Sequence, residues 1–391
     1  MKVLIVTETL YEGGAEIFML RLARAITANG NQATVLLLNK NKCNLRILSQ
    51  FPDVRVEGFA LPFAFVFEII DRLLFKLGLD FSVKNLFYLK KLQKKIKNFD
   101  IVHSHYIKVD YLLCLLKRRI NFRHVVTVHG DYSSQYYNHQ KYGSSIWRSM
   151  SDKITTLRDS VDKWVLISEE QIYFFINVIN VDKGKIIKIW NGFSLNKKTE
   201  EDSKNYFISK NHFNICMAGR GVKEKGWELA IEAMKLLPDD CDLYLIGDSS
   251  YLRSLKKKTI HERRIFFVGF LENPSVFIEK CDVLIMPTLF PYESLPNIII
   301  ESLSVGIPVI ATNTGEIKKM ITDEESSSKA GLLLEMIDGK IEIKHISERI
   351  LELYYEREKL FNMKKVARIV SLKFSMENCV KSYLEVYKNL L

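Results

Sequence analysis

The 391-residue chain lacks the patterns that mark several classes of protein. Its six cysteines are scattered and form no CxxC pair or metal-binding spacing, which excludes a disulfide framework and a zinc motif. No uninterrupted apolar run is long enough to span a bilayer. Residues 1–6 form a short strand pattern that reaches a polar loop too soon for a signal peptide. We therefore expect a cytoplasmic protein with buried, reduced thiols.

The sequence also lacks the signatures that mark binding of two classes of ligand. The glycines do not have the spacing of a dinucleotide fingerprint, so NAD is not expected. Neither a recognition-helix motif nor an RNA-binding aromatic signature occurs, so nucleic acid is not an expected partner. We find no internal repeat and no low-complexity tract.

The length and composition indicate two ordinary globular domains. Apolar runs alternate with helical patterns in both halves, which predicts two Rossmann-like domains of the α/β class, each a parallel sheet covered by helices. Domain boundaries are expected at 1–195 and 213–373, with a polar, lysine-rich linker at 196–212. Residues 374–391 are expected to form an amphipathic helix that packs on the first domain. The predicted strands are 3–6, 33–38, 101–103, 124–128, 164–167, 214–218, 243–246, 265–268, 283–286 and 308–311.

Most unusual polar residues and glycines follow the carboxyl ends of these strands, where open parallel sheets bind ligands. This placement predicts a cleft between two facing domains. The residues concerned are Gly13, Gly14, His103, His105, His129, Gly219, Arg220, Lys225, Gly247, Asp248, Gly269 and Phe270. For His103 and His105, hydrogen-bonded structural histidines are favoured over metal ligands, because no third ligand has a recognisable spacing.

The stretch 291–301 carries two carboxylates, with Glu293 before a predicted helix and Glu301 about one turn inside it. Pro296 suits the first helical position. Carboxylates accept hydrogen bonds from sugar hydroxyls, and a helix N-terminus attracts an anion. A capped surface helix with two solvated glutamates is the alternative.

Arg220 and Lys225 form the best predicted anion site, because an arginine fork and a lysine charge together suit a diphosphate. Solvated surface cations are the alternative. Asp240 and Asp242 match the two-aspartate pattern of metal-dependent sugar transferases, but they precede strand 243–246 and are expected in a surface loop. No metal site is predicted.

Charge and aromatic residues are unevenly distributed in the first half. The segment 81–123 carries much of the excess positive charge, and residues 59–79 include Phe59, Phe63, Phe65, Phe67 and Phe75. The segment 59–97 therefore combines apolar and basic surface, which is typical of peripheral contact with an anionic membrane. A core helix with a solvated lysine face is the alternative.

The motifs along nearly the whole chain resemble those of the GT-B glycosyltransferases, specifically family 4 of retaining, nucleotide-sugar-dependent enzymes. They comprise Gly13-Gly14-Ala15-Glu16, 100–105, 127–130, Asn191-Gly192, Gly219-Arg220, Lys225-Gly226, 293–301, 306–311 and 374–378. The chain differs from the commonest family pattern at Ser294, where many members have glycine, and at 314–316, which has one glycine instead of two. Because of these two differences, the resemblance does not identify the donor sugar.

The resemblance implies a role for each matched residue. Arg220 and Lys225 would hold the donor diphosphate, Glu301 the ribose and Glu293 the donor sugar. The backbone N–H groups of Leu295, Asn297 and Ile298 would lie near the phosphates, and His129 would lie beside the sugar and the reacting carbon. Gly13 and Gly14 would allow closure on phosphate and acceptor, Gly219 would belong to the donor site, and Phe270 would lie near the base.

The expected reaction is transfer of a sugar from a nucleotide-diphosphate sugar to a glycan acceptor, with neither metal nor cofactor. We expect a lipid-linked acceptor and a place in bacterial surface polysaccharide synthesis, at the inner face of the cytoplasmic membrane. The alternatives are a GT-B-type sugar-nucleotide epimerase and a non-catalytic partner that binds sugar nucleotide or membrane.

Overall fold

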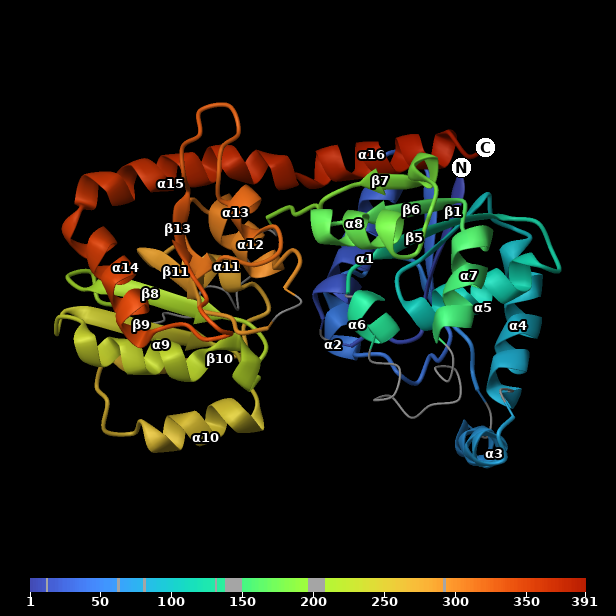
Figure 1. Ribbon diagram of the computed structural model, residues 1–391, viewed down its shortest axis with the longest axis horizontal. Helices are drawn as coiled ribbons and strands as arrows, with labels where there is room; N and C mark the ends of the chain where they lie inside the picture. Colours follow the sequence, from blue (N-terminus) through green and yellow to red (C-terminus); the bar gives the residue numbers. More distant parts are fainter. Residues whose placement is uncertain are drawn as a thin grey trace. The chain divides into compact units, whose positions relative to one another are not determined.

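The computed structural model describes residues 1–11, 13–61, 64–79, 82–130, 132–137, 150–195, 208–290 and 293–391. These residues divide into two compact units, one of residues 1–192 with 376–391 and one of residues 193–375. Each unit is a parallel sheet with helices on both faces (Figure 1), as the alternation in the sequence predicts. Residues 196–207, most of the predicted linker, lie outside the described residues.

The first unit contains a seven-stranded sheet in the order β3-β2-β1-β4-β5-β6-β7, with every neighbouring pair parallel. Its strands are β1 Lys2–Thr7, β2 Gln32–Leu37, β3 Val56–Gly58, β4 Ile101–Ser104, β5 Arg123–Val128, β6 Lys163–Leu166 and β7 Ile186–Lys188. Its helices are α1 Gly14–Ala28, α2 Leu45–Ser49, α3 Ala64–Lys76, α4 Val83–Ile96, α5 Ile107–Lys117, α6 Tyr132–Tyr137, α7 Met150–Ser160, α8 Glu169–Asn177 and α16 Met376–Lys388.

The second unit contains a six-stranded parallel sheet in the order β10-β9-β8-β11-β12-β13. Its strands are β8 Phe213–Ala218, β9 Cys241–Ile246, β10 Ile265–Gly269, β11 Val283–Met286, β12 Val309–Thr312 and β13 Gly331–Leu334. Its helices are α9 Trp227–Ala233, α10 Ser250–Lys258, α11 Pro274–Ile278, α12 Asn297–Ser304, α13 Ile317–Met320, α14 Ile343–Tyr355 and α15 Arg357–Ser371, with a 3-10 turn η4 at Lys223–Lys225.

All ten predicted strands are present, and three further strands were missed. The missed strands, β3, β7 and β13, each lie at a sheet edge and have only three or four residues. Their residues are mostly half-buried, in contrast to the fully buried central strands. A short edge strand has one partner and one covered face, so its sequence lacks the continuous apolar run of a central strand.

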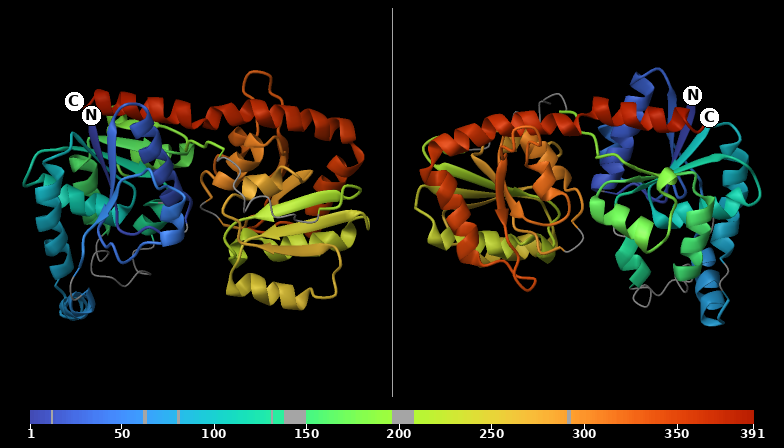
Figure 2. Two further views of the ribbon diagram at one scale, coloured as in Figure 1. Left: turned by 180° about the vertical axis from the view of Figure 1, so that it is seen from behind. Right: turned by 45° about the horizontal axis from the view of Figure 1, so that its top comes forward.

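The last helix of the chain packs against the first unit rather than the second. The face of α16 predicted from the sequence, Val380, Tyr383, Leu384 and Tyr387, is buried in one cluster with Phe18 of α1. The two helices lie side by side on the same face of the sheet (Figure 2). The C-terminal helix is thereby fixed to residues near the start of the chain.

Both sheets reverse their winding direction at one point. In the first unit the chain moves outward from β1 to β3 and then returns to the other side of β1 with β4; in the second unit β8 and β11 are related in the same way. At such a point the flanking loops diverge to opposite sides and leave a crevice at the carboxyl ends of the two strands. The two reversals therefore define where each unit can bind a ligand.

Candidate active site

The reversal in the second unit brings together the loops that follow β8 and β11. Arg220 and Lys225 lie in the loop after β8, and Glu293 lies in the loop that leads from β11 to α12. The Lys225 ammonium contacts the Glu293 carboxylate, and the two side chains are only 13% and 12% exposed. Residues that are 68 positions apart in the chain therefore form one charged pair at the predicted ligand edge.

Backbone hydrogen bonds hold the loop after β8 in place. The buried Trp227 indole donates to the Arg220 carbonyl at 3.1 Å, the Ser249 hydroxyl donates to the Gly221 carbonyl at 2.7 Å, and the Leu289 N–H donates to the Glu224 carbonyl at 2.7 Å. The three donors come from different segments of the second unit, so three hydrogen bonds hold the loop. Within the described part of the chain, the exposed Arg220 guanidinium has no hydrogen-bond or ion-pair partner.

Glycine is required at the end of that loop. Gly226 has a left-handed backbone (φ +80°), and a Cβ atom there would lie 2.0 Å from the Pro287 carbonyl oxygen. Because only glycine adopts this conformation without strain and leaves this space, the loop can turn into α9 directly against the end of β11. The turn positions Lys225 for its contact with Glu293.

The Glu293 loop is held from its other side by the residues that follow β12. The Glu316 N–H donates to the Ser294 carbonyl at 2.9 Å, and Gly315 has a left-handed backbone (φ +54°). A Cβ atom at Gly315 would lie 2.0 Å from the Glu293 carbonyl oxygen. The single glycine of 314–316 is therefore the one that allows close contact with the carboxylate loop.

Helix α12 begins one residue later than expected. Pro296 is its N-cap residue rather than its first helical residue, and Glu301 lies one turn inside the helix. Among the described residues, the backbone N–H groups of Leu295 and Ile298 have no acceptor. These groups, the helix dipole and the cations Arg220 and Lys225 are suited to bind the negative charge of a diphosphate.

Phe270 follows β10 and is 40% exposed. The glycine before it, Gly269, has a left-handed backbone (φ +87°) and accepts a hydrogen bond from the Gly247 N–H at 2.9 Å. Gly219 at the end of β8 donates to the Ile246 carbonyl at 3.1 Å. The carboxyl ends of β8, β9 and β10 are thus linked through glycine backbones, as the strand-end positions in the sequence predict.

The other predicted site residues belong to the first unit. Gly13 is the N-cap residue of α1, and Gly14 is its first residue. A Cβ atom at Gly13 would lie 2.2 Å from a carboxylate oxygen of Glu16, which folds back over the helix start. His129 directly follows β5.

Three histidines lie together at the ends of β4 and β5. His103 is fully buried within β4, and both of its ring nitrogens are paired, Nδ1 with the Tyr387 hydroxyl at 2.7 Å and Nε2 with the Thr127 hydroxyl at 2.8 Å. His103 therefore has a structural role, as expected. His105 Nδ1 and His129 Nε2 are 2.8 Å apart. The sequence indicated the histidines but not Tyr387, because nothing in a linear pattern links residues 284 positions apart.

The two carboxylates of the metal-transferase pattern have protein partners at the opposite end of the sheet. The Tyr354 hydroxyl donates to Asp240 at 2.9 Å, and His212 lies 3.0 Å from Asp242. Over the described ranges, no group of three or more His, Cys, Asp or Glu residues is placed to hold a metal ion.

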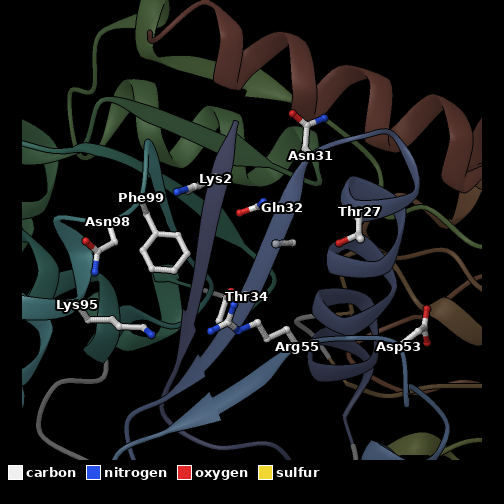
Figure 3. A pocket seen from close by; sticks show the side chains of 11 residues that line it. Lys2, Thr27, Asn31, Gln32, Thr34, Asp53, Arg55, Lys95, Asn98 and Phe99 are labelled. Atoms are coloured by element: carbon white, nitrogen blue, oxygen red, sulfur yellow. The ribbon is translucent and has the colours of Figure 1, made fainter.

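The first unit contains a cavity of about 390 Å³ at the amino ends of its strands (Figure 3). Three of its four charged side chains have ion-pair partners, since Lys95 and Arg55 contact Glu57 and Arg24 binds Asp53 at 2.6 Å. The cavity is lined by Lys2, Thr27, Asn31, Gln32, Ala33, Thr34, Asp53, Arg55, Lys95, Asn98 and Phe99, none of which is a predicted site residue. We do not assign the donor site to it.

Comparison with known proteins identifies the class. Residues 12–197 match the profile described as Glycosyltransferase Family 4, and residues 198–370 match that described as Glycosyl transferases group 1. The two adjoining matches cover most of the chain. The protein belongs to the GT-B glycosyltransferases. It is an enzyme of the family 4 type, and the motifs found in its sequence are those of that family.

The sequence identity between the chain and individual relatives is low. The chain is 27% identical to the O-antigen biosynthesis glycosyltransferase WclY of Escherichia coli, over 76% of this chain and 82% of that one. It is 28% identical to a UDP-Gal:alpha-D-GlcNAc-diphosphoundecaprenol alpha-1,3-galactosyltransferase of the same species, over 66% and 67%. The crystal structure of Anabaena HepE in complex with UDP and glucose has the same fold, with a TM-score of 0.77, 18% identity and full coverage of both chains.

The role of Gly315 can be tested against a matched glycine. Gly339 also has a left-handed backbone (φ +73°), but a Cβ atom there would meet nothing within 4 Å. We expect Gly339→Ala to lose about 1 kcal/mol of stability through backbone strain, and Gly315→Ala to lose about 1–3 kcal/mol more through overlap with the Glu293 backbone. Urea unfolding measures both values, and equal losses would show that the close contact is unimportant.

Proposed function

We propose that this glycosyltransferase moves a sugar from a nucleotide-diphosphate sugar to a glycan acceptor, with retention of the anomeric configuration. The observation that carries the proposal is the Lys225–Glu293 pair beside Arg220 at the β8/β11 reversal. Two cations and a hydroxyl-binding carboxylate at one edge suit a ligand that joins a diphosphate to a sugar.

The chemistry needs charge stabilisation more than any other contribution. When the bond between the sugar and the phosphate breaks, negative charge develops on the diphosphate leaving group. We propose that Arg220, Lys225 and the N–H groups at the start of α12 stabilise that charge, because they belong to the loops that follow β8 and β11. Glu301 would bind the ribose, and Phe270 would lie near the base. His129 would lie beside the sugar and the reacting carbon, and Gly13 and Gly14 would lie near the phosphate and acceptor.

We further propose a lipid-linked glycan acceptor and a role in bacterial surface polysaccharide assembly. Two relatives support this proposal: one is named as an O-antigen biosynthesis glycosyltransferase, and the other as a galactosyltransferase that acts on a sugar linked to diphosphoundecaprenol. Such an acceptor would place the reaction at the inner face of the cytoplasmic membrane. None of the helices in the described ranges is long and apolar enough to cross a membrane.

Helix α3 of the first unit has the surface that peripheral membrane contact requires. Phe65 of α3 is 74% exposed, and Leu77, directly after the helix, is 75% exposed. The cations Arg72 and Lys76 of α3 are exposed too. The following helix, α4, carries five lysines and no acidic residue. Of the aromatic residues in 59–79, Phe63 and the side chain of Phe75 lie outside the described residues.

The position of α3 suits an acceptor held in a bilayer. It lies at the periphery of the first unit, beyond the start of α4 (Figures 1 and 2). The Ser82 hydroxyl and Val83 N–H at the start of α4 bind the Asp71 carboxylate at 2.6 and 2.8 Å, and Lys84 lies 4.0 Å from Glu8, just after β1. Helix α3 is therefore connected, through the start of α4, to the carboxyl-end side of the sheet, where Gly13 and His129 also lie.

Removing a donor-site charge should abolish turnover without unfolding the protein. We expect Arg220→Ala or Glu301→Ala to lower kcat/KM by about a hundredfold or more, with a nearly unchanged circular-dichroism melt. The donor would be the UDP- or GDP-sugar that most raises the melting temperature, and proton NMR of the product would report its anomeric configuration. Lys223→Ala, an exposed lysine of the same turn, is the matched control. Normal rates in Arg220→Ala would refute the donor-site assignment.

Turnover should not need a divalent ion, because the proposed charge stabilisation comes from side chains and backbone N–H groups. We expect the rate in excess EDTA to equal the rate in added Mg²⁺ or Mn²⁺. A strict requirement for either ion would contradict this proposal and would direct attention back to Asp240 and Asp242.

Membrane contact can be measured by liposome flotation. We expect the protein to float with vesicles that contain anionic lipid and to float less with neutral ones, since each cation near an anionic surface contributes roughly 1 kcal/mol. Phe65→Ser with Leu77→Ser, or Arg72→Gln with Lys76→Gln, should reduce flotation. Ile260→Ser, at a 75% exposed apolar residue of the second unit, should not. Flotation indifferent to lipid charge and to the α3 substitutions would exclude this surface.

A further inference from the structure

The histidine pair at the ends of β4 and β5 has a defined geometry. His105 and His129 follow neighbouring parallel strands, and their rings are nearly parallel, inclined by 14° with centroids 5.1 Å apart. The Phe18 ring of α1 packs edge-on against the His129 ring at 5.2 Å, and the His103 ring lies 4.2 Å from that of His105. In this arrangement Nδ1 of His105 faces Nε2 of His129 at 2.8 Å.

Both rings are neutral at physiological pH. Burial lowers the pKa of His129 to about 3. Burial also places the pKa of His105 well below its ordinary value, and the neighbouring His103 and His129 lower it further. A neutral imidazole carries one proton, so one nitrogen of the 2.8 Å contact donates and the other accepts. The tautomer of one ring therefore fixes that of the other.

Two arrangements satisfy the shared hydrogen bond. If His129 donated from Nε2, His105 would carry its remaining proton on Nε2, which is buried and has no acceptor in the described part of the chain. If His105 donates from Nδ1, the remaining N–H is Nδ1 of His129, which is also buried and has no partner among the described residues. The His105 residue is only 3% exposed, whereas His129 is partly exposed at the strand ends. Because an unpaired N–H costs most where no oxygen can reach it, the second arrangement is favoured.

We propose that His105 is a positioning residue, whose Nδ1–H donates to His129 Nε2 and holds His129 as the Nδ1–H tautomer. This inference rests on the role proposed above for His129 beside the donor sugar. The unpaired Nδ1–H of His129 then serves as a neutral donor for an oxygen of the bound sugar. Binding relieves the cost of the unpaired group, so the interaction favours the liganded enzyme.

The test combines a direct reading of the tautomer with kinetics. In protein labelled with ¹⁵N-histidine, NMR is expected to show His129 as the Nδ1–H tautomer in the wild type, and a shift towards Nε2–H in His105→Phe. Turnover of the donor selected by the thermal-shift screen should fall roughly tenfold in His105→Phe, as expected for one lost hydrogen bond. The affinity for the matching nucleotide diphosphate should stay unchanged. His105→Asn, whose amide N–H can replace Nδ1–H, should restore the tautomer and most of the turnover.

Tyr387→Phe is the matched control, because it removes the neighbouring hydrogen bond to His103 and leaves the His105–His129 contact in place. It should lower the melting temperature without changing the His129 tautomer or kcat. An Nε2–H tautomer of His129 in the wild type, or an unchanged tautomer in His105→Phe, overturns the proposal. Full turnover by His129→Ala overturns its catalytic part, and loss of turnover by Arg220→Ala in the same assay would show that the donor-site proposal still stands.

Discussion

The structure depends on one topological constraint, the reversal of winding direction in each parallel sheet. Parallel strands need long crossover connections, so all the loops at their carboxyl ends lie at one edge. Where the winding reverses, adjacent loops diverge and leave backbone and side-chain groups open to a ligand. In the second unit the reversal lies between β8 and β11, and the loops on either side carry Arg220, Lys225 and Glu293. In the first unit it lies between β1 and β4, next to Gly13 and the histidines.

The charged pair at the second reversal is held by residues that carry no charge. Removal of the Lys225 and Glu293 side chains from water is costly unless their geometry is fixed. Gly226 allows the lysine loop to lie against the Pro287 carbonyl, and Gly315 allows the residues after β12 to lie against the Glu293 carbonyl. The loops thus approach within backbone contact, which no side chain larger than hydrogen would permit. Site geometry and local stability are coupled at these two glycines.

The first unit uses a buried hydrogen-bond network for the same purpose. Tyr383 and Tyr387 of α16 reach the strand ends through Thr127 and His103, with contacts of 2.7–2.9 Å. The end of the chain therefore stabilises the strand ends from which His105 and His129 emerge. Because burial keeps these histidines neutral, they act through the direction of their N–H groups rather than through charge. This distinguishes them from the cationic groups of the second unit.

The fold and most of the candidate site could be predicted from the sequence by itself. Buried central strands are continuous apolar runs, so all nine were found, together with the edge strand β10. The residues after these strands identified Arg220, Lys225, Glu293 and His129 as site candidates. The edge strands β3, β7 and β13 were missed, because their three or four mostly half-buried residues leave no clear pattern. Only the tertiary structure decided which residues pair: Lys225 with Glu293, His105 with His129, and His103 with Tyr387. The physical reason is that periodicity records how each residue faces its own element, whereas these partners, 24 to 284 positions apart, meet only when separate elements pack.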